Sequence, residues 1–355
     1  MDSEVVFDYY DMKTWPRFKE YVSYLEKGGE EKNPQILYGI AEYYHKVLGN
    51  HEESERIVKK NLRTVPEGSF RNKNILLLCE LYIQTGNITE ILLETEKLKD
   101  ESNNPRLLNI LGFLHRIQGK YDLAEECDKK VLQIRETVSG LNHPETAGSY
   151  NNFGVLYRIQ GKFDLAEEYH KKSIQIGEKS LGSSHPDVAI MYDNLGVLYS
   201  VQGKFDLAEK CHEKKVQIEQ EILRPDHPRL ADSYNSLGTV YYYQEKYDLA
   251  EEYFKKSLQV REITANIVNP ETANLYNNLG FVCKEQKKYD LAEEYFKKSI
   301  QVRETILGIN HPDTEESYIN LCVLYERQGK YDLVDCLRER YETLKLQVRK
   351  DLKQN

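Results

Sequence analysis

The sequence lacks the features that accompany most membrane-spanning, secreted and nucleic-acid-binding proteins. It contains no stretch of about 18 apolar residues, and its first residues are acidic, so we expect neither a transmembrane helix nor a secretory signal. Its net charge is -9, whereas a nucleic-acid-binding surface needs an excess of positive charge. The same net charge disfavours an anionic membrane surface. These absences predict a protein whose partners are neither nucleic acids nor membranes.

Motifs of common catalytic and metal-binding sites are missing as well. The sequence contains no P-loop, no G-x-G-x-x-G, no G-x-S-x-G and no H-E-x-x-H. The cysteines form no C-x-x-C pair and are spread along the chain, which is typical of reduced, buried thiols in a cytoplasmic protein. We therefore predict a cytoplasmic protein that is not an enzyme and has no cofactor and no metal site. The cysteines are Cys79, Cys127, Cys211, Cys283, Cys322 and Cys336.

What the sequence does contain is an internal repeat of 42 residues. Three unrelated markers share one register, which indicates a repeat architecture. The first marker is a glycine, present as Gly112, Gly154, Gly196, Gly238 and Gly280, with Cys322 at the next step. The second is an aromatic residue, present as Tyr121, Phe163, Phe205, Tyr247, Tyr289 and Tyr331. The third is a linker residue followed by proline, present as His143, His185, His227, Asn269 and His311.

Each unit has the pattern of two helices. In residues 145–182, aromatic side chains recur at helical spacing as far as Tyr157. Gly161 then interrupts the pattern and suits the left-handed conformation that closes a helix. Asp164 and Glu167 follow with the spacing of a capping box, so we predict Asp164 as the N-cap of the second helix. The same pair recurs as Asp122/Glu125, Asp206/Glu209, Asp248/Glu251 and Asp290/Glu293.

The repeated glycine and histidine residues have structural explanations. A glycine inside a helix costs about 1 kcal/mol relative to alanine, so we expect Gly154 and its equivalents to mark a close approach of two helices. The linker histidines lie one repeat apart, which is too far for them to share a metal ion, and Asn269 replaces one of them. Because asparagine is a good N-cap, we interpret the linker residues as helix caps. His170 and His212 share a position with phenylalanines of later units, so we interpret them as packed rings.

The unit resembles the tetratricopeptide repeat. The residues that carry the resemblance are an aromatic four positions before the glycine, leucine or phenylalanine directly before it, tyrosine three positions after it and alanine twelve positions after it. The 42-residue length and the motifs N-N-[LF]-G, Q-G-K-[YF]-D-L-A-E-E and L-G-x-x-H-P are similar to the kinesin light chain and nephrocystin-type subclass. The resemblance implies an all-α fold, a right-handed superhelical solenoid of antiparallel helix pairs.

The register divides the chain into four parts. Residues 105–345 contain six units with the 42-residue period, and residues 34–104 contain two degenerate units with looser spacing. We expect residues 1–33 to form an N-terminal cap and residues 346–355 to be the end of a C-terminal capping helix. The reason is that the terminal units of a solenoid turn a polar face to water.

Two columns of asparagine lie on the first helix of each unit, three and two positions before the glycine. An asparagine side chain offers two donors and an acceptor, so it can pair with the N–H and C=O groups of an extended peptide. Such ladders hold peptide backbones in kinesin-light-chain-like grooves, and the resemblance implies this role for Asn152, Asn194, Asn278 and Asn320. The alternative is that the amides bond to neighbouring helices and stabilise the stack. The first column contains Asn109, Asn151, Asn235 and Asn277, with Asp193 in third place, and Ser236 interrupts the second column.

Positions four and five after the glycine differ between units. They are cationic at Arg116 and Arg158, aromatic at Tyr242 and Tyr243, and mixed from Lys284 onward. We therefore predict a ligand with acidic residues toward the N-terminal half and an apolar or aromatic anchor near Tyr242.

These observations favour a protein–protein interaction scaffold or adaptor that binds an extended peptide segment of a partner in its concave groove. The alternative is a regulatory or sensor subunit that docks on and controls an effector enzyme. A partner segment that binds as a synthetic peptide favours the adaptor, whereas a partner that binds only when folded favours the regulator. The sequence leads to no prediction of the partner's identity or of the oligomeric state.

Overall fold

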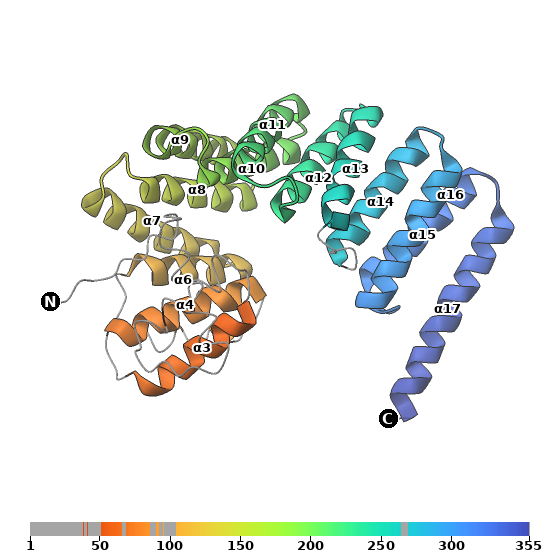
Figure 1. Cartoon of the computed structure of the whole chain (residues 1–355), viewed down its shortest axis with the longest axis horizontal. Helices are drawn as coiled ribbons and strands as arrows, with labels where there is room; N and C mark the ends of the chain where they lie inside the picture. The colour runs from red at the N-terminus through yellow and green to blue at the C-terminus, as the bar shows by residue number, and fades with distance from the viewer. Residues whose placement is uncertain are drawn as a thin grey trace. The chain divides into compact units, whose positions relative to one another are not determined.

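A computed structural model of the chain describes residues 51–65, 69–85, 104–263 and 269–354, together with residues 38, 41, 90, 91 and 95. The chain divides into two compact units, Met1–Val138 and Ser139–Asn355. Every element in the described part is an α-helix, which confirms the predicted all-α fold (Figure 1). The N-terminal cap predicted over residues 1–33 lies outside the described residues, as do parts of the two degenerate units predicted over residues 34–104.

The first unit contains the helices α3 (His51–Thr64), α4 (Ser69–Thr85), α6 (Pro105–Ile117) and α7 (Tyr121–Val138). Helix α3 packs against α4, and α6 packs against α7. Leu76, Leu77 and Leu78 of α4 are consecutive and all buried, so this helix is covered on several sides. The Ser54 hydroxyl donates to the carbonyl of Ala41 at 2.7 Å, which satisfies a buried polar group.

The second unit contains five consecutive helix pairs. Each second helix packs against the first helix of its own pair and also against the first helix of the next pair. The pairs therefore stack in chain order, as in a solenoid (Figure 1). The pairs are α8 (Pro144–Ile159) with α9 (Phe163–Leu181), α10 (Pro186–Val201) with α11 (Phe205–Ile222), α12 (Pro228–Tyr243) with α13 (Tyr247–Ile263), α14 (Pro270–Glu285) with α15 (Tyr289–Ile306), and α16 (Pro312–Arg327) with α17 (Tyr331–Gln354).

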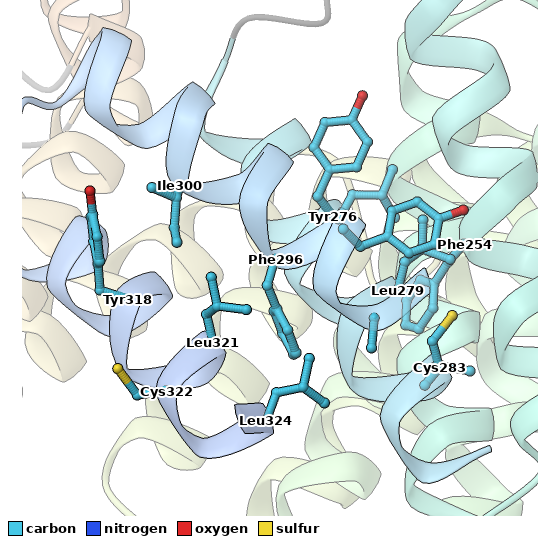
Figure 2. Close-up of a cluster of buried hydrophobic side chains, with 14 of the residues drawn as sticks. Phe254, Tyr276, Leu279, Cys283, Phe296, Ile300, Tyr318, Leu321, Cys322 and Leu324 are labelled. Carbon is cyan, nitrogen blue, oxygen red and sulfur yellow. The ribbon is translucent and has the colours of Figure 1, made fainter. Parts of the chain in front are cut away.

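The core of the second unit runs across the boundaries between pairs. Phe254, Leu279, Phe296, Leu321 and Leu324 belong to one cluster of buried side chains that spans α13 to α16 (Figure 2). Since each pair contributes side chains to the same cluster as its neighbours, no pair buries its apolar face alone. Stacking therefore supplies most of the stability of each pair.

The linker residues act as helix caps, as predicted. The Nδ1 atom of His143 accepts a hydrogen bond from the N–H of Glu145 at 3.3 Å, and His185 accepts one from Asp187 at 3.1 Å. Asn269 makes the corresponding bond through its side-chain oxygen, and His227 and His311 repeat the histidine arrangement. The proline that follows each linker residue occupies the first turn, where its missing N–H costs nothing.

Glycine closes most first helices in the predicted left-handed conformation. Gly161 has φ +73° and leads into a turn in which the Lys162 N–H donates to the Tyr157 carbonyl at 2.9 Å. In two units a larger residue takes this conformation, Glu245 with φ 60° and Lys287 with φ 62°. These two positions carry backbone strain that glycine avoids elsewhere.

The predicted capping boxes are wrong. Helix α9 begins at Phe163, so Asp164 is its second residue, and its N-cap, Lys162, makes no side-chain capping bond. The reason is the turn described above, which already brings the chain into helical conformation before Asp164. The aspartate instead lies in the first turn, where it interacts favourably with the helix dipole. The other helices with this start are α7, α11, α13 and α15, so Asp122, Asp206, Asp248 and Asp290 are not N-caps either.

The acidic residues of these first turns connect one pair to the next. Gln244, at the end of α12, donates to Asp206 at 2.9 Å and to Glu209 at 2.8 Å on α11. Lys246 adds a bond to Glu209 at 2.9 Å. We call such contacts the turn links. They recur at α13 and α15, where Gln286 and Lys288 bind Asp248 and Glu251.

Cysteine burial follows the prediction with one exception. Cys79, Cys127, Cys211, Cys283 and Cys322 are buried, whereas Cys336 is exposed. Cys336 occupies the position on α17 where earlier units carry an exposed glutamate, so the expectation of a buried thiol is wrong there.

Candidate functional site

The two asparagine columns of the second unit are joined by hydrogen bonds. Asn194 of α10 donates from Nδ2 to Oδ1 of Asn151 on α8, at 3.2 Å. The same bond joins Asn278 to Asn235 at 3.1 Å, and Asn320 to Asn277 at 3.1 Å. We call these three bonds the amide ladder. Each bond connects the first helices of consecutive pairs, as the alternative interpretation of the asparagines predicts.

The ladder changes in its middle. Asp193 of α10 and Ser236 of α12 occupy the two positions that carry asparagine elsewhere. Lys215 of α11 places its Nζ 3.0 Å from Asp193, and His212 places its Nδ1 3.3 Å away. Burial raises the pKa of Asp193, but His212 and Lys215 more than offset this and lower it below its usual range. Asp193 is therefore a carboxylate at neutral pH.

Lys215 is a residue that the sequence analysis did not single out. It is almost fully buried and lies beneath Asp193. The corresponding residues of three other units are serines whose hydroxyls donate to a backbone carbonyl of the first helix: Ser173, Ser257 and Ser299. A lysine in a column of serines was the available signal, because a buried ammonium requires a partner of opposite charge.

The repeated glycines seat a side chain of the second helix. A Cβ atom on Gly154 would lie 2.5 Å from the His170 ring, and one on Gly238 would lie 2.8 Å from the Phe254 ring. This confirms the interpretation of the glycines as points of close approach. His170 is fully buried and its Nδ1 lies 3.1 Å from Oδ1 of Asn151, so this ring also contacts the ladder. Burial, assisted by the positive charge of Arg158, lowers the pKa of His170 to about 4.

In the first unit the side chain on the glycine is an acid. Asp128 of α7 lies against Gly112, and Arg116 of α6 binds its carboxylate at 2.8 Å. Burial raises the pKa of Asp128 to about 6, although Arg116 opposes this shift. The Arg116 guanidinium is thus engaged within its own helix pair. Asn109 lies on the same helix and is partly buried.

The remaining predicted site residues lie on the second unit. Tyr243 is exposed and stacks on Phe205 of the preceding pair, with ring centroids 5.3 Å apart and planes within 5°. Tyr242 is partly buried against Tyr243 and Tyr247. Lys284 pairs with Glu285 at 3.2 Å. Asn152 and Arg158 of α8 are both partly buried.

Neither a membrane span nor a metal centre emerges from the described residues. None of the described helices combines the length and the apolar character needed to cross a bilayer. Within the same residues, histidine, cysteine and acidic side chains form no group of three that could hold a metal ion.

Comparison with known families identifies the repeat. The tetratricopeptide repeat matches residues 105–179, 147–214, 187–263 and 271–340, and a second version of the same repeat matches residues 235–304. These segments cover well over half of the chain. The chain belongs to the tetratricopeptide repeat family. A protein of this family is a scaffold for protein–protein interaction.

Solved structures share the tetratricopeptide solenoid. BtubC (BKLC) from P. vanneervenii aligns with TM-score 0.55 and 18% identity, over 65% of this chain and 92% of that one. The nearly identical repeats of a putative kinesin light chain from Podosopora anserina align with TM-score 0.52 and 21% identity, over 58% of this chain and 98% of that one. The apo form of the quorum sensor NprR from B. thuringiensis aligns with TM-score 0.54 and 15% identity, over 86% of this chain and 97% of that one. At these identities the likeness is one of fold, and it includes tetratricopeptide arrays of the kinesin-light-chain type. No curated protein matches the chain significantly.

Proposed function

We propose that this tetratricopeptide protein binds an extended peptide segment of another protein along the first helices of its second unit. The observation that carries the proposal is the amide ladder, because it fixes the orientation of asparagine side chains that are partly exposed. Stacked helix pairs form a concave surface lined by their first helices, and this is the surface on which the ladder lies.

The ladder leaves hydrogen-bonding capacity for a ligand. Asn194 uses one N–H of its amide in the bond to Asn151. An asparagine amide has a second N–H and a carbonyl oxygen with two lone pairs. These groups can pair with the C=O and N–H of a peptide backbone without reading its side chains. The structural and functional interpretations of the asparagines are therefore compatible, since the bonds between helices position the amides for the peptide.

The spacing of the ladder suits an extended chain. Neighbouring packed helices lie about 10 Å apart, and an extended peptide rises about 3.3 Å per residue. One ladder position thus corresponds to about three peptide residues, and a segment from Asn194 to Asn320 needs roughly ten residues.

Side-chain preferences of the ligand come from residues beside the ladder. We propose that Tyr242 and Tyr243 receive an apolar or aromatic side chain, because Tyr243 is exposed and held by its stack on Phe205. The preference for acidic residues depends on Arg158, since Arg116 already binds Asp128. The carboxylate of Asp193 adds a preference for a hydrogen-bond donor at the middle of the segment.

Peptide display tests the proposal and does not require an identified partner. A random library of peptides of about 12 residues, long enough to span the ladder at about 3.3 Å per residue, is selected on the full chain. Synthetic copies of the selected peptides are then measured by fluorescence polarisation. We expect the change of Asn194, Asn278 and Asn320 together to alanine to weaken binding at least tenfold.

The matched control changes asparagines that lie away from the ladder. Asn142 and Asn310 are exposed residues of the linkers, so their change to alanine should leave the affinity unchanged. Equal affinity of the ladder variant and wild type would contradict the proposal. Failure of every selected peptide to bind, combined with binding of a folded partner to the same variants, would instead favour the regulatory subunit.

A further inference from the structure

The last helix pair has an open apolar hollow. Helices α16 and α17 line a cavity of about 360 Å³ whose walls include Tyr318, Ile319, Val323, Leu337 and Tyr341. In the earlier pairs of the second unit, the equivalent side is covered by the first helix of the next pair. Within the described residues no helix covers it at α16 and α17.

The residues of this hollow differ from their equivalents in the direction opposite to that expected for a cap. Ile319 takes the position of Asn277, the ladder acceptor of the preceding pair, and it is 53% exposed. Val323 is 44% exposed, whereas the equivalent residues of the other pairs are partly buried. A terminal unit that faces water is expected to be polar. Exposed apolar residues that adjoin a cavity instead mark a surface that another protein covers.

Helix α17 carries the pattern of a helix with two apolar contacts. Val334, Leu337, Tyr341 and Leu344 recur at spacings of three, four and three residues, which is the stripe of a helix that packs along another helix. Val334 and Tyr341 are buried, and Tyr341 packs on Tyr318 with ring centroids 4.8 Å apart. Leu337 and Leu344 are only partly buried, so part of the stripe remains for a further helix.

Charge identifies the occupant. The first half of α17 is acidic, with Asp332, Asp335, Glu339 and Glu342. Its second half is basic, with Lys345, Arg349, Lys350 and Lys353. Two such helices that pack antiparallel place each acidic half beside a basic half. The rim of the hollow adds Glu315 and Glu326, of which Glu326 is bound by Arg338.

We propose that a second copy of this chain packs its α17 antiparallel against the hollow between α16 and α17, which gives a two-fold symmetric dimer. A two-fold interface is self-complementary, as the charge order of α17 is. The four helices of the two copies then form a bundle, and Ile319, Val323 and Leu337 of each copy are covered. The peptide-binding face on the other first helices stays available, so the dimer presents two such faces.

Sedimentation velocity over a wide range of concentration tests the dimer. We expect the full chain to sediment as a dimer, and the double variant Ile319→Arg with Val323→Arg to weaken the association at least tenfold. Both side chains are exposed, so these changes should leave the thermal unfolding of the variant close to that of wild type. A wild-type chain that remains monomeric at the highest soluble concentration would overturn the proposal, whatever other partner covers the hollow.

Matched variants control for the added charge. Ile190 is 45% exposed and Val201 is 56% exposed, and both lie on α10, away from the hollow. Ile190→Arg with Val201→Arg should leave the dimer intact. If this variant dissociated as much as the first, or if the first remained dimeric, the interface would lie elsewhere.

Cys336 gives an independent readout. It is the exposed cysteine of α17, and the other described cysteines are buried. A spin label at Cys336 should report one defined distance between the two copies by pulsed electron spin resonance, because both labels lie on the paired α17 helices. A broad distribution, or no measurable distance in a confirmed dimer, would contradict the antiparallel packing of α17.

Discussion

The pairs α8/α9 and α10/α11 differ from the pairs α12/α13 and α14/α15 in the ring that lies on the repeated glycine. His170 occupies this place in the first of them, and Phe296 occupies it in the last. The steric fit is the same, since an added Cβ would come within 2.5 Å of His170 and within 2.6 Å of Phe296. The comparison teaches that the glycine is required by the close approach of a ring and not by the chemistry of that ring.

The chemistry of the ring decides whether the core is connected to the ladder. His170 reaches Asn151, which also accepts the ladder bond from Asn194. A phenylalanine ring has no such bond to offer, so the ladder above Phe254 and Phe296 is independent of the core. The histidine has a cost, because its Nε2 is buried without a hydrogen-bond partner among the described residues.

The largest expected effect separates the two kinds of ring. Phe296→Ala should lower the free energy of unfolding by about 3–5 kcal/mol, since it removes a fully buried ring and leaves a cavity. His170→Ala should cost less, about 1–3 kcal/mol, because it also removes a buried nitrogen without a partner. Urea denaturation of the two variants provides the measurement. Equal losses would mean that the polar character of His170 has no energetic consequence.

The next effect should be the same in both groups. Gly280→Ala and Gly154→Ala should each destabilise the protein by about 1–3 kcal/mol, because the new Cβ overlaps a ring. Without the overlap, alanine would stabilise a helix interior by about 1 kcal/mol. Cys322→Ala is the control, since that position already carries a Cβ. A gain in stability at either glycine, measured by thermal unfolding, would refute the close approach.

A smaller effect should appear only as pH falls. The unfolded chain protonates His170 near pH 6.5, whereas burial keeps the folded pKa at about 4. The stability that depends on neutral His170 is therefore complete above about pH 6.5 and is lost as the pH falls toward 4. His170→Phe should show a smaller loss of stability than wild type between neutrality and about pH 5.

Urea titrations at these two pH values provide the comparison. Tyr169→Phe is a suitable control, because it changes a neighbouring ring and adds no group that titrates in this range. An identical pH dependence of wild type and His170→Phe would show that His170 does not report on the core.

The smallest effect concerns coupling. Asn194→Ala and Asn278→Ala should each cost about 1 kcal/mol, because each removes one hydrogen bond between first helices. The loss from Asn194→Ala should depend on whether His170 is present, with a coupling of about 0.5 kcal/mol or more. The loss from Asn278→Ala should not depend on Phe254. Double-mutant cycles measure both couplings, and equal values would remove the distinction between the two groups.

Most of the fold follows from the sequence because its determinants are local and repeated. The glycine seat, the left-handed turn at Gly161 and the linker caps each depend on residues within one unit, and each is confirmed. The capping box failed because the turn before Asp164 sets the start of the helix. That backbone geometry is not visible in residue types alone.

The site was less accessible from the sequence. The asparagine columns were evident, but the bond from Asn194 to Asn151 spans two units, and its partners follow only from the stacking. The pairing of Arg116 with Asp128 was missed for a related reason, since it depends on how two helices pack. The available signal was an aspartate at a position where later units carry a ring, on the unit whose first helix carries that arginine.

The turn links have a consequence for how the array comes apart. Each link joins acids on one second helix to Gln and Lys of the following turn. Burial raises the pKa of Glu251, but Lys255 and Lys288 more than offset this and lower it to about 2. A pair in the middle of the second unit therefore opens only against contacts on both sides, whereas a terminal pair opens against one. Exchange of backbone amides should accordingly be slowest near α12 and α13 and quicken toward α17, so that the solenoid frays from its end like a rope rather than melting as a block.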